Sequence, residues 1–265
     1  MKRIFFTLAV ALIFPLLFFS ACLFPVCRHR LFLVSDGIAT NVKTDSLSYQ
    51  RGWGTYFPLF LKSKLSFENV SCADASTRSF LSDSLWNKII DSAKYNDFIF
   101  IQLGQNDMDV EDTLKYSNIN DFDSNLMVMV NQALDKRYRC YLLTPVPRYS
   151  YHDQTYYNSH GAYIDAIKLV AKRMQVPLID VHQIILDSFS NMEFDSLYNF
   201  YASGRNSTLN KLPNNVNFYL NDYGAFQVAK IIAESIKKMP HLRHYVIYND
   251  TISPNDSLSH FSLSK

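Results

Sequence analysis

Acid–base or metal chemistry in this chain would depend on one histidine and three aspartates. His160 precedes a glycine at the start of a predicted helix, and Asp36, Asp74 and Asp107 each follow a predicted strand. Hard divalent cations prefer carboxylates, so the three aspartates would form a cation site only if they converged. Asp36 is more simply explained as the residue that holds its own turn through backbone hydrogen bonds. We therefore predict no bound metal ion and no cofactor.

The first apolar run after the N-terminal segment, residues 31–34, leads directly into Ser-Asp-Gly at 35–37. Four apolar residues that end in a turn are typical of a buried parallel strand. Ligands of open α/β sheets bind just outside the carboxyl ends of the strands, so we expect chemistry at Asp36 and Gly37. Gly37, however, has no side chain that could react. Ser35 lies about 6–7 Å deeper along an extended strand and is a poor substitute.

The elements that must position this turn alternate between strands and helices, which predicts a parallel sheet covered on both faces. We predict a single-domain, three-layer α/β/α sandwich with a five-stranded parallel sheet. The expected strands cover residues 31–35, 65–70, 97–103, 139–144 and 176–180. The expected helices cover 54–63, 83–93, 121–136, 158–174 and 221–238, and 190–215 is expected to be a long loop on the site side of the sheet.

Single residues mark the ends of some of these helices. Asp83 and Asp121 have the residue type that caps a helix N-terminus, and Gly161 lies near the start of the fourth helix. Residues 245–248 are a candidate for a short edge strand. Cys140 lies in an apolar strand, where we expect it to be buried as a small hydrophobic residue.

Composition limits the class of protein. The chain has 265 residues, of which 48% are hydrophobic and 19% charged, enough for one domain with a sizeable core. A net charge of +2 without a basic stripe argues against a nucleic-acid partner. Cys27, Cys72 and Cys140 lack the spacing of metal ligands, so we predict no zinc site. We expect a monomer.

Residues 1–21 have the pattern of a targeting segment. Lys2 and Arg3 precede an apolar stretch over 4–19, and Ser-Ala-Cys at 20–22 ends it. This resembles a bacterial lipoprotein signal, in which Cys22 is lipidated and becomes the mature N-terminus. An uncleaved anchor over 4–26 and plain secretion are the alternatives. All three place the domain outside the cytoplasm, and we expect a lipid-anchored protein of the bacterial cell envelope that faces the periplasm or the exterior.

The predicted domain organisation follows from these segments. A signal peptide covers 1–21, a short tether 22–30, the α/β domain 31–240 and a C-terminal tail 241–265. Within 31–238, eight stretches resemble the SGNH (GDSL-type) hydrolase family, and most closely its rhamnogalacturonan acetylesterase branch. They are Phe-Leu-Val-Ser-Asp-Gly at 32–37, Gly-Trp-Gly at 52–54, residues 69–80 ending in Ser-Thr-Arg-Ser-Phe, Phe-Ile-Gln-Leu-Gly-Gln-Asn-Asp at 100–107, Thr-Pro-Val-Pro-Arg at 144–148, His-Gly-Ala-Tyr at 160–163, Pro-Leu-Ile-Asp at 177–180 and Asn-Asp-Tyr-Gly-Ala at 221–225.

The resemblance implies a flavodoxin-like fold and a Ser-His-Asp esterase site, but the catalytic positions are replaced. The family serine falls on Gly37, and the glycine of the oxyanion hole falls on Asp74. The aspartate and histidine of the triad fall on Val216 and Tyr219 without gaps, or on Asn214 and Asn217 after a two-residue insertion. Neither register supplies an acid or a base, and losing one triad member already costs on the order of 10⁴ in rate.

The retained family positions are the candidate binding residues. They are Asp36, Gly104, Asn106 and Asp107, with Gln105 in place of a frequent histidine, and we add Trp53 and His160. Trp53 could stack on a sugar ring or pack a helix start against the sheet, and His160 could be structural or catalytic.

We therefore predict a catalytically inactive surface lipoprotein, a pseudoenzyme that binds a glycan or an acetylated polysaccharide or acts as an interaction module. The alternative is a carbohydrate O-acetylesterase with a rearranged site. A fold alone does not decide between them.

Overall fold

The protein is described here by a computed structural model covering residues 29–40, 50–148, 151–152, 155–156, 159–189, 198–202, 219–247, 249 and 251–253. The predicted signal peptide, Cys22, Cys27 and most of the predicted tether lie outside these described residues. The same is true of most of the loop predicted over 190–215 and of the end of the tail.

Five parallel strands form the central sheet, as the sequence predicts. They are β1 (His29–Ser35), β2 (Leu65–Asn69), β3 (Phe98–Gln102), β4 (Arg139–Leu143) and β7 (Leu178–Ile179). Their order is β2-β1-β3-β4-β7, so β1 lies between β2 and β3. From β1, the chain first adds β2 on one side and then adds β3, β4 and β7 on the other. A separate two-stranded antiparallel sheet of β5 (Tyr151–His152) and β6 (Thr155–Tyr156) was not predicted.

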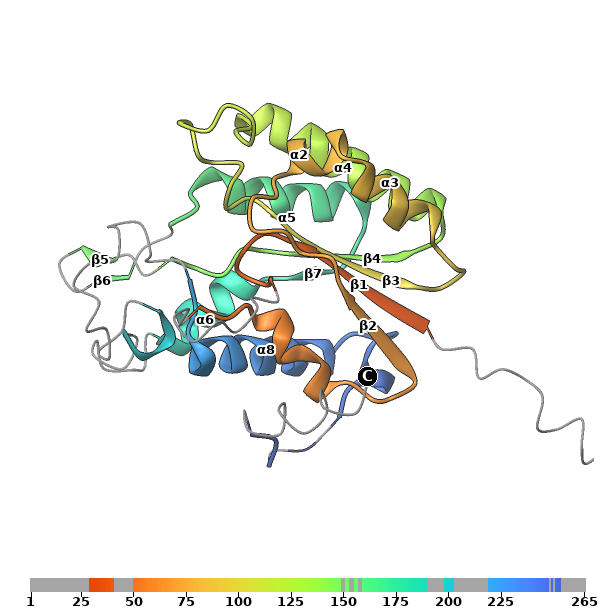
Figure 1. Ribbon diagram of the computed structural model, residues 1–265, viewed down its shortest axis with the longest axis vertical. Coiled ribbons are helices and arrows are strands. Elements are labelled where there is room, and N and C mark those ends of the chain that lie inside the picture. The colour runs from red at the N-terminus through yellow and green to blue at the C-terminus, as the bar shows by residue number, and fades with distance from the viewer. Residues whose placement is uncertain are drawn as a thin grey trace, which may run out of the picture.

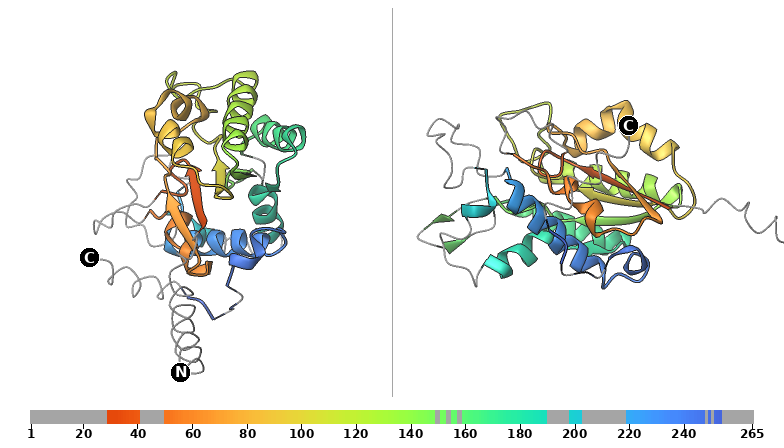
Figure 2. Two further views of the ribbon diagram at one scale, coloured as in Figure 1. Left: turned by 90° about the vertical axis from the view of Figure 1, so that its right-hand side faces the viewer. Right: turned by 60° about the horizontal axis from the view of Figure 1, so that its bottom comes forward.

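Helices cover both faces of the sheet (Figures 1 and 2). One face carries α2 (Thr77–Ser82), α3 (Ser84–Asp91), α4 (Ile119–Asp135) and α5 (Ala162–Met174). The other face carries the 3-10 turns η1 (Trp53–Thr55) and η2 (Phe57–Phe60) with α6 (Val181–Phe189) and α8 (Asp222–Ile236). Two further 3-10 turns are η3 (Tyr198–Phe200) and η4 (Arg243–Tyr245). Within the described ranges, no helix is both long and apolar enough to cross a membrane.

The side chains of β1 show how the two cores form. Leu31 and Leu33 pack into the core under α8, and Phe32 and Val34 pack into the core under α4 and α5. Successive side chains of a strand point to opposite faces, so a strand covered on both sides must be apolar throughout. This is why β1 appears in the sequence as an uninterrupted apolar run.

Some of the element predictions were wrong in detail. The helix expected over 54–63 is divided into η1 and η2, and Pro58 at the start of η2 lacks the amide hydrogen that a continuous helix would need. The strand expected over 245–248 is reduced to a single antiparallel bridge between Leu61 and Val246. The helices α2 and α6 were not predicted at all.

The predicted helix ends and cysteines have mixed outcomes. Asp83 caps α3 by accepting the Leu85 amide, as predicted. Asp121 does not cap α4; Asn118 does, and Asp121 lies in the first turn, where its charge favours the helix N-terminus. Gly161 immediately precedes α5 with a φ of 50°, a region that favours glycine. Cys140 is buried, as predicted, and both it and the exposed Cys72 are free thiols.

Candidate functional site

Asp36 organises the turn at the carboxyl end of β1. Its Oδ1 accepts the Ile38 amide hydrogen at 3.1 Å. Its backbone oxygen accepts the Ala39 amide at 3.3 Å and the Thr40 hydroxyl at 3.1 Å. Because the carboxyl and the carbonyl of one residue both bind the next few residues, the turn is rigid, and Gly37 is held at a fixed place.

Tyr219 lies against Gly37. A Cβ atom built on Gly37 would be 3.5 Å from the Tyr219 Cε1 and 3.5 Å from the Cα and the oxygen of Ala73. These are ordinary van der Waals contacts, so a small side chain would fit. The structure thus brings together Gly37 and Tyr219, the positions that the sequence comparison assigns to the family serine and, in the ungapped register, to the family histidine. Val216, Asn214 and Asn217 lie outside the described residues.

Ser35 cannot replace the missing nucleophile from its place in the strand. It is fully buried, and its hydroxyl donates to Gln102 Oε1 at 3.3 Å. The same Gln102 oxygen accepts the Trp53 indole N–H at 2.8 Å. Ser35 therefore belongs to an internal hydrogen-bond network below the turn and does not face it.

The groups at the oxyanion position are engaged elsewhere. The Asn106 side-chain amide donates to the carbonyl oxygens of Ala73 at 3.0 Å and Ala75 at 2.8 Å. An amide nitrogen has two hydrogens, so both are used within the 73–75 loop. The Asp74 carboxylate is 78% exposed and pairs with Lys115 Nζ at 2.7 Å. The Asn106 amide is thus committed to the backbone, and the Asp74 carboxylate is paired with a lysine.

Two of the predicted aspartates are buried, and burial raises the pKa of each. Desolvation raises the Asp36 pKa to about 7, against the opposing hydrogen bond from Ile38, and the nearby Asp107 raises it further. Desolvation also raises the Asp107 pKa to about 6, although the Thr77 hydroxyl and amide both donate to its carboxyl group. Asp107 lies 2.5 Å from the Thr77 hydroxyl at the start of α2, so it holds that helix in place.

His160 is fixed in one hydrogen-bonded arrangement. Its Nε2 is 2.8 Å from Gln105 Oε1, which can only accept, so Nε2 carries the hydrogen. Nδ1, 3.1 Å from the Ser159 hydroxyl, is then the acceptor. Burial lowers the His160 pKa well below its usual value. The buried, neutral ring joins the loop after β3 to the start of α5. This contact matches the structural one of the two roles considered for His160.

His182 packs edge to face against His160, with ring centroids 5.6 Å apart. Burial lowers its pKa to about 4. The Arg148 guanidinium donates to the Gln105 carbonyl at 3.4 Å. Both histidine rings are buried, whereas Arg148 is partly exposed.

Trp53 is not available to a sugar. Its side chain is fully buried and packs edge to face on Phe57 with ring centroids 5.3 Å apart. The stacking role predicted for it is therefore wrong, and the packing alternative describes it. Gly104 is also buried, with a φ of 127° that a side chain would strain. Of the six predicted binding residues, Asn106 alone reaches the surface in part.

The three aspartates do not form a metal site in the described part of the chain. Asp74 is paired with Lys115, and Asp107 is saturated by Thr77. Among the described residues, no group of three histidine, cysteine or acidic side chains is placed to hold a metal ion.

Sequence reasoning missed Lys115, Ser159 and His182. His182 could have been found, because it follows the fifth strand at the sheet edge where ligands bind. Lys115 lies in a loop, and only the fold brings it to Asp74, 41 residues away. Ser159, whose hydroxyl accepts the Arg148 amide at 2.9 Å, is likewise explained only by its partners.

Comparison with known proteins identifies a family for this chain. The model of the GDSL-like lipase/acylhydrolase family matches residues 36–204. The chain is 26% identical over 216 residues to the rhamnogalacturonan acetylesterase RhgT of Bacillus subtilis, covering 79% of this chain and 90% of that protein. It is 24% identical to YesY of the same organism, a probable rhamnogalacturonan acetylesterase, over 80% of this chain and 94% of that one.

Solved structures show the same fold. The Bacillus subtilis protein YxiM superposes with a TM-score of 0.70 at 19% identity, covering 82% of this chain and 58% of that one. A catalytic mutant of an acetylxylan esterase from Geobacillus stearothermophilus gives a TM-score of 0.57 at 12% identity, over 79% of this chain and 93% of that one. With its five-stranded sheet and motifs in order, the chain belongs to the GDSL-like lipase/acylhydrolase (SGNH) family, in its rhamnogalacturonan acetylesterase-like branch.

Proposed function

We propose that this member of the family has no serine esterase activity and is instead a glycan-binding module of the bacterial cell envelope, anchored through a lipid on Cys22. The observation that carries the loss of activity is the contact between Gly37 and Tyr219. A glycine stands where the family nucleophile belongs, and a tyrosine ring lies where the base belongs, 3.5 Å from the Cβ position.

Neither residue can perform the missing step. A serine hydroxyl attacks an ester only when a base takes its proton, and glycine has no hydroxyl. A tyrosine is a poor base at neutral pH because its phenol is already protonated, and burial raises the Tyr219 pKa further, helped by the charges of Asp74 and Asp36. The site has therefore lost both the atom that attacks and the group that activates it.

A glycan ligand is supported by the relatives and by the surface at this edge. The two curated relatives are named for a polysaccharide ester. Tyr223, 48% exposed at the start of α8, offers an aromatic face, and Asp74 and Lys115 add polar groups near Gly37. Aromatic faces combined with a few polar groups suit sugar rings.

The first test is an acetyl-ester hydrolysis assay on the purified protein, with acetylated rhamnogalacturonan as substrate. We expect a rate no higher than that of buffer. Turnover that serine-directed phosphonates block would contradict the loss of the nucleophile. Turnover insensitive to them would support the alternative, a carbohydrate O-acetylesterase with a rearranged site, which the names of the relatives favour.

Repair variants test which residues were lost. Gly37→Ser alone should stay inactive, because the hydroxyl would still lack a base. The quadruple variant Gly37→Ser, Asp74→Gly, Val216→Asp and Tyr219→His restores the family pattern in the ungapped register. Its matched control replaces the last two changes with Asn214→Asp and Asn217→His. Weak activity in the first and none in the second is expected; activity from Gly37→Ser alone would overturn the proposal.

Binding is tested separately by titrating the wild-type protein with acetylated rhamnogalacturonan oligosaccharides. Tyr223→Ala should weaken binding at least several-fold if its ring stacks on a sugar. Tyr95→Ala is the matched control, because Tyr95 is also exposed but lies before β3, at the opposite edge of the sheet. Equal loss in both variants would rule out stacking on Tyr223. No binding by the wild type would rule out this ligand.

A further inference from the structure

A basic pocket lies at the amino edge of the sheet, opposite the remodelled site. It has a volume of about 270 Å³ and is lined by Lys64, Arg139, His29, His241 and His244 together with aromatic side chains. Of the described residues that line it, none is acidic. A concave surface that gathers cationic groups without acidic ones attracts anions.

The two permanent cations of the pocket are held on aromatic walls. Lys64 Nζ lies 5.2 Å from the centroid of the Tyr245 ring, and the Arg139 guanidinium lies 5.8 Å from that of Phe98. The Arg139 Nε donates to Asn96 at 3.1 Å. Neither side chain has an ion pair to an acidic residue in the described part of the chain. Aromatic rings thus hold both side chains in position, and no acidic side chain of the described residues neutralises their charge.

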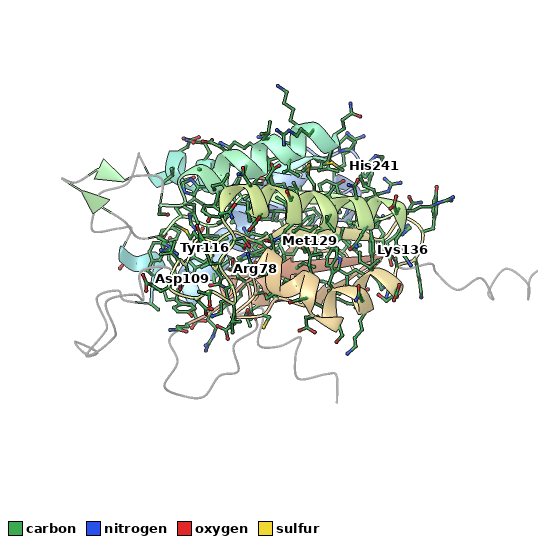
Figure 3. All side chains as sticks on the ribbon, turned by 90° about the horizontal axis from the view of Figure 1, so that it is seen from above. Arg78, Asp109, Tyr116, Met129, Lys136 and His241 are labelled. Carbon is green, nitrogen blue, oxygen red and sulfur yellow. The ribbon has the colours of Figure 1, made fainter. Side chains whose placement is uncertain are left out.

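Two acidic residues near this edge, Asp97 and Asp91, are already paired. Asp97 is buried and accepts from Arg30, the next residue after the pocket histidine His29. Asp91 pairs with Lys136 at 3.1 Å. Figure 3 shows Lys136 and His241 at one end of the molecule, with Asp109 and Tyr116 at the other. The Asp97 and Asp91 carboxylates are therefore engaged with Arg30 and Lys136 and do not neutralise Lys64 or Arg139.

The place of the pocket in the chain indicates its ligand. His29 begins β1 and lines the pocket, and it follows Cys22 by seven residues. Seven extended residues span at most about 25 Å, which is shorter than the roughly 45 Å diameter expected for a domain of this size. A lipid on Cys22 would therefore keep this edge of the domain close to the bilayer.

We propose that the pocket binds the phosphate of an anionic phospholipid headgroup, so that the domain docks on the membrane through its amino edge. The inference deepens the proposed function and rests on its lipid anchor for the choice of ligand. An acidic polysaccharide would suit the charge equally well, but nothing would hold that polymer beside His29, whereas the anchor holds the bilayer there.

The test uses the full chain in a neutral alkyl-maltoside detergent, titrated with soluble dihexanoyl phosphatidylglycerol. Hydrogen exchange of segments 62–65 and 240–247 reports binding. We expect slower exchange that saturates, and none with dihexanoyl phosphatidylcholine. Lys64→Gln with Arg139→Gln should raise the midpoint about 30-fold, from about fivefold for each basic side chain. The matched control, Lys88→Gln with Lys172→Gln, removes the same charge from exposed sites on α3 and α5 and should leave the midpoint unchanged.

Other outcomes overturn the proposal. An equal midpoint for inorganic phosphate would indicate a free-anion site, and protection by oligogalacturonate instead of the lipid would indicate an acidic glycan. If loss of Arg139 prevents folding, Lys64→Gln with His241→Gln, both at exposed positions, gives the same test; an unchanged midpoint in that variant contradicts the pocket. The anchor is read separately, from the mass of the N-terminal peptide, so either idea can fail without the other.

Discussion

A carboxyl group that folding buries makes stability depend on pH. The Asp36 carboxyl group has a pKa near 4 in the unfolded chain and about 7 in the folded protein, so it loses its proton at a higher pH when folded. Between these values the folded state keeps a proton that the unfolded state has lost, so the contribution of Asp36 to stability falls as pH rises through this window. Above pH 7 the cost is complete, and the shift corresponds to as much as about 4 kcal/mol.

Asp36→Asn should remove this dependence, since an amide can still accept the Ile38 hydrogen but cannot ionise. We expect the free energy of unfolding of the variant to rise relative to the wild type between pH 4 and pH 8. Chemical denaturation at both pH values measures the difference. The lowered pKa values of His160 and His182 act in the opposite direction but are common to both proteins. Asp91→Asn, at an exposed site, is the control, and an equal pH dependence in Asp36→Asn and the wild type would refute the assignment.

The sequence predicts much of the identity of the site residues but little of their contacts and burial. The sequence alone places a glycine at the nucleophile position, and the structure puts Tyr219 beside it. The sequence could not show that the Asn106 amide donates to Ala73 and Ala75, because those partners lie more than 30 residues away. Burial was equally hidden: Trp53 has a residue type that suits sugars, but its exposure depends on where η2 packs.

Among the elements, the start of α8 depends on one close backbone approach. A Cβ atom on Gly224 would lie 2.0 Å from the Phe200 carbonyl oxygen, in the segment that leads back to the site. Gly224→Ala should cost more than about 2 kcal/mol in unfolding free energy, although alanine usually favours a helix. Gly37→Ala is the control, because its Cβ would meet only contacts of 3.5 Å, and it should be neutral or slightly stabilising. Similar thermal unfolding of the two variants would contradict this packing.

The buried salt bridge between Asp97 and Arg30 leads to a prediction for the sheet. Asp97 accepts from the backbone and guanidinium of Arg30 and from the Lys94 amide, which ties the starts of β1 and β3. Asp97→Ala should destabilise the protein by about 3–5 kcal/mol, because it leaves the partly buried Arg30 guanidinium with only the half-exposed Glu68, 3.8 Å away. Asp91→Ala, which breaks only the exposed pair with Lys136, should cost less than about 1 kcal/mol. Equal losses, measured by denaturant titration, would disprove the difference.

The predicted and observed elements differ where local signals were weak. Strands buried on both faces form apolar runs that the sequence shows directly, and all five were found. The segment that forms α6 follows β7 almost without a turn, so no break in the sequence marks its start. The cap of α4 was misplaced by three residues because Asn118 and Asp121 are both good capping residues, and only the geometry distinguishes them.

For the whole molecule, the lipid anchor is the prediction with the largest consequence. Cys22→Ala should abolish lipid labelling and processing of the N-terminus, because Cys22 directly follows the small residues that end the predicted lipoprotein signal. Mass spectrometry of the N-terminal peptide and membrane fractionation measure both effects. Ser20→Ala, beside the same site, should be processed normally. A wild-type protein with an uncleaved N-terminus that stays in the membrane fraction would favour the alternative, a signal anchor.

The first strand begins beside the last 3-10 turn of the described domain. His29 opens β1 and Tyr245 lies in the last 3-10 turn, yet their rings meet edge to face with centroids 5.9 Å apart. The strand between His29 and Gly37 runs away from that point for about 20 Å. Attachment through the segment before His29 would therefore aim the Gly37 edge away from the support, whether that support is a membrane, a wall or another domain.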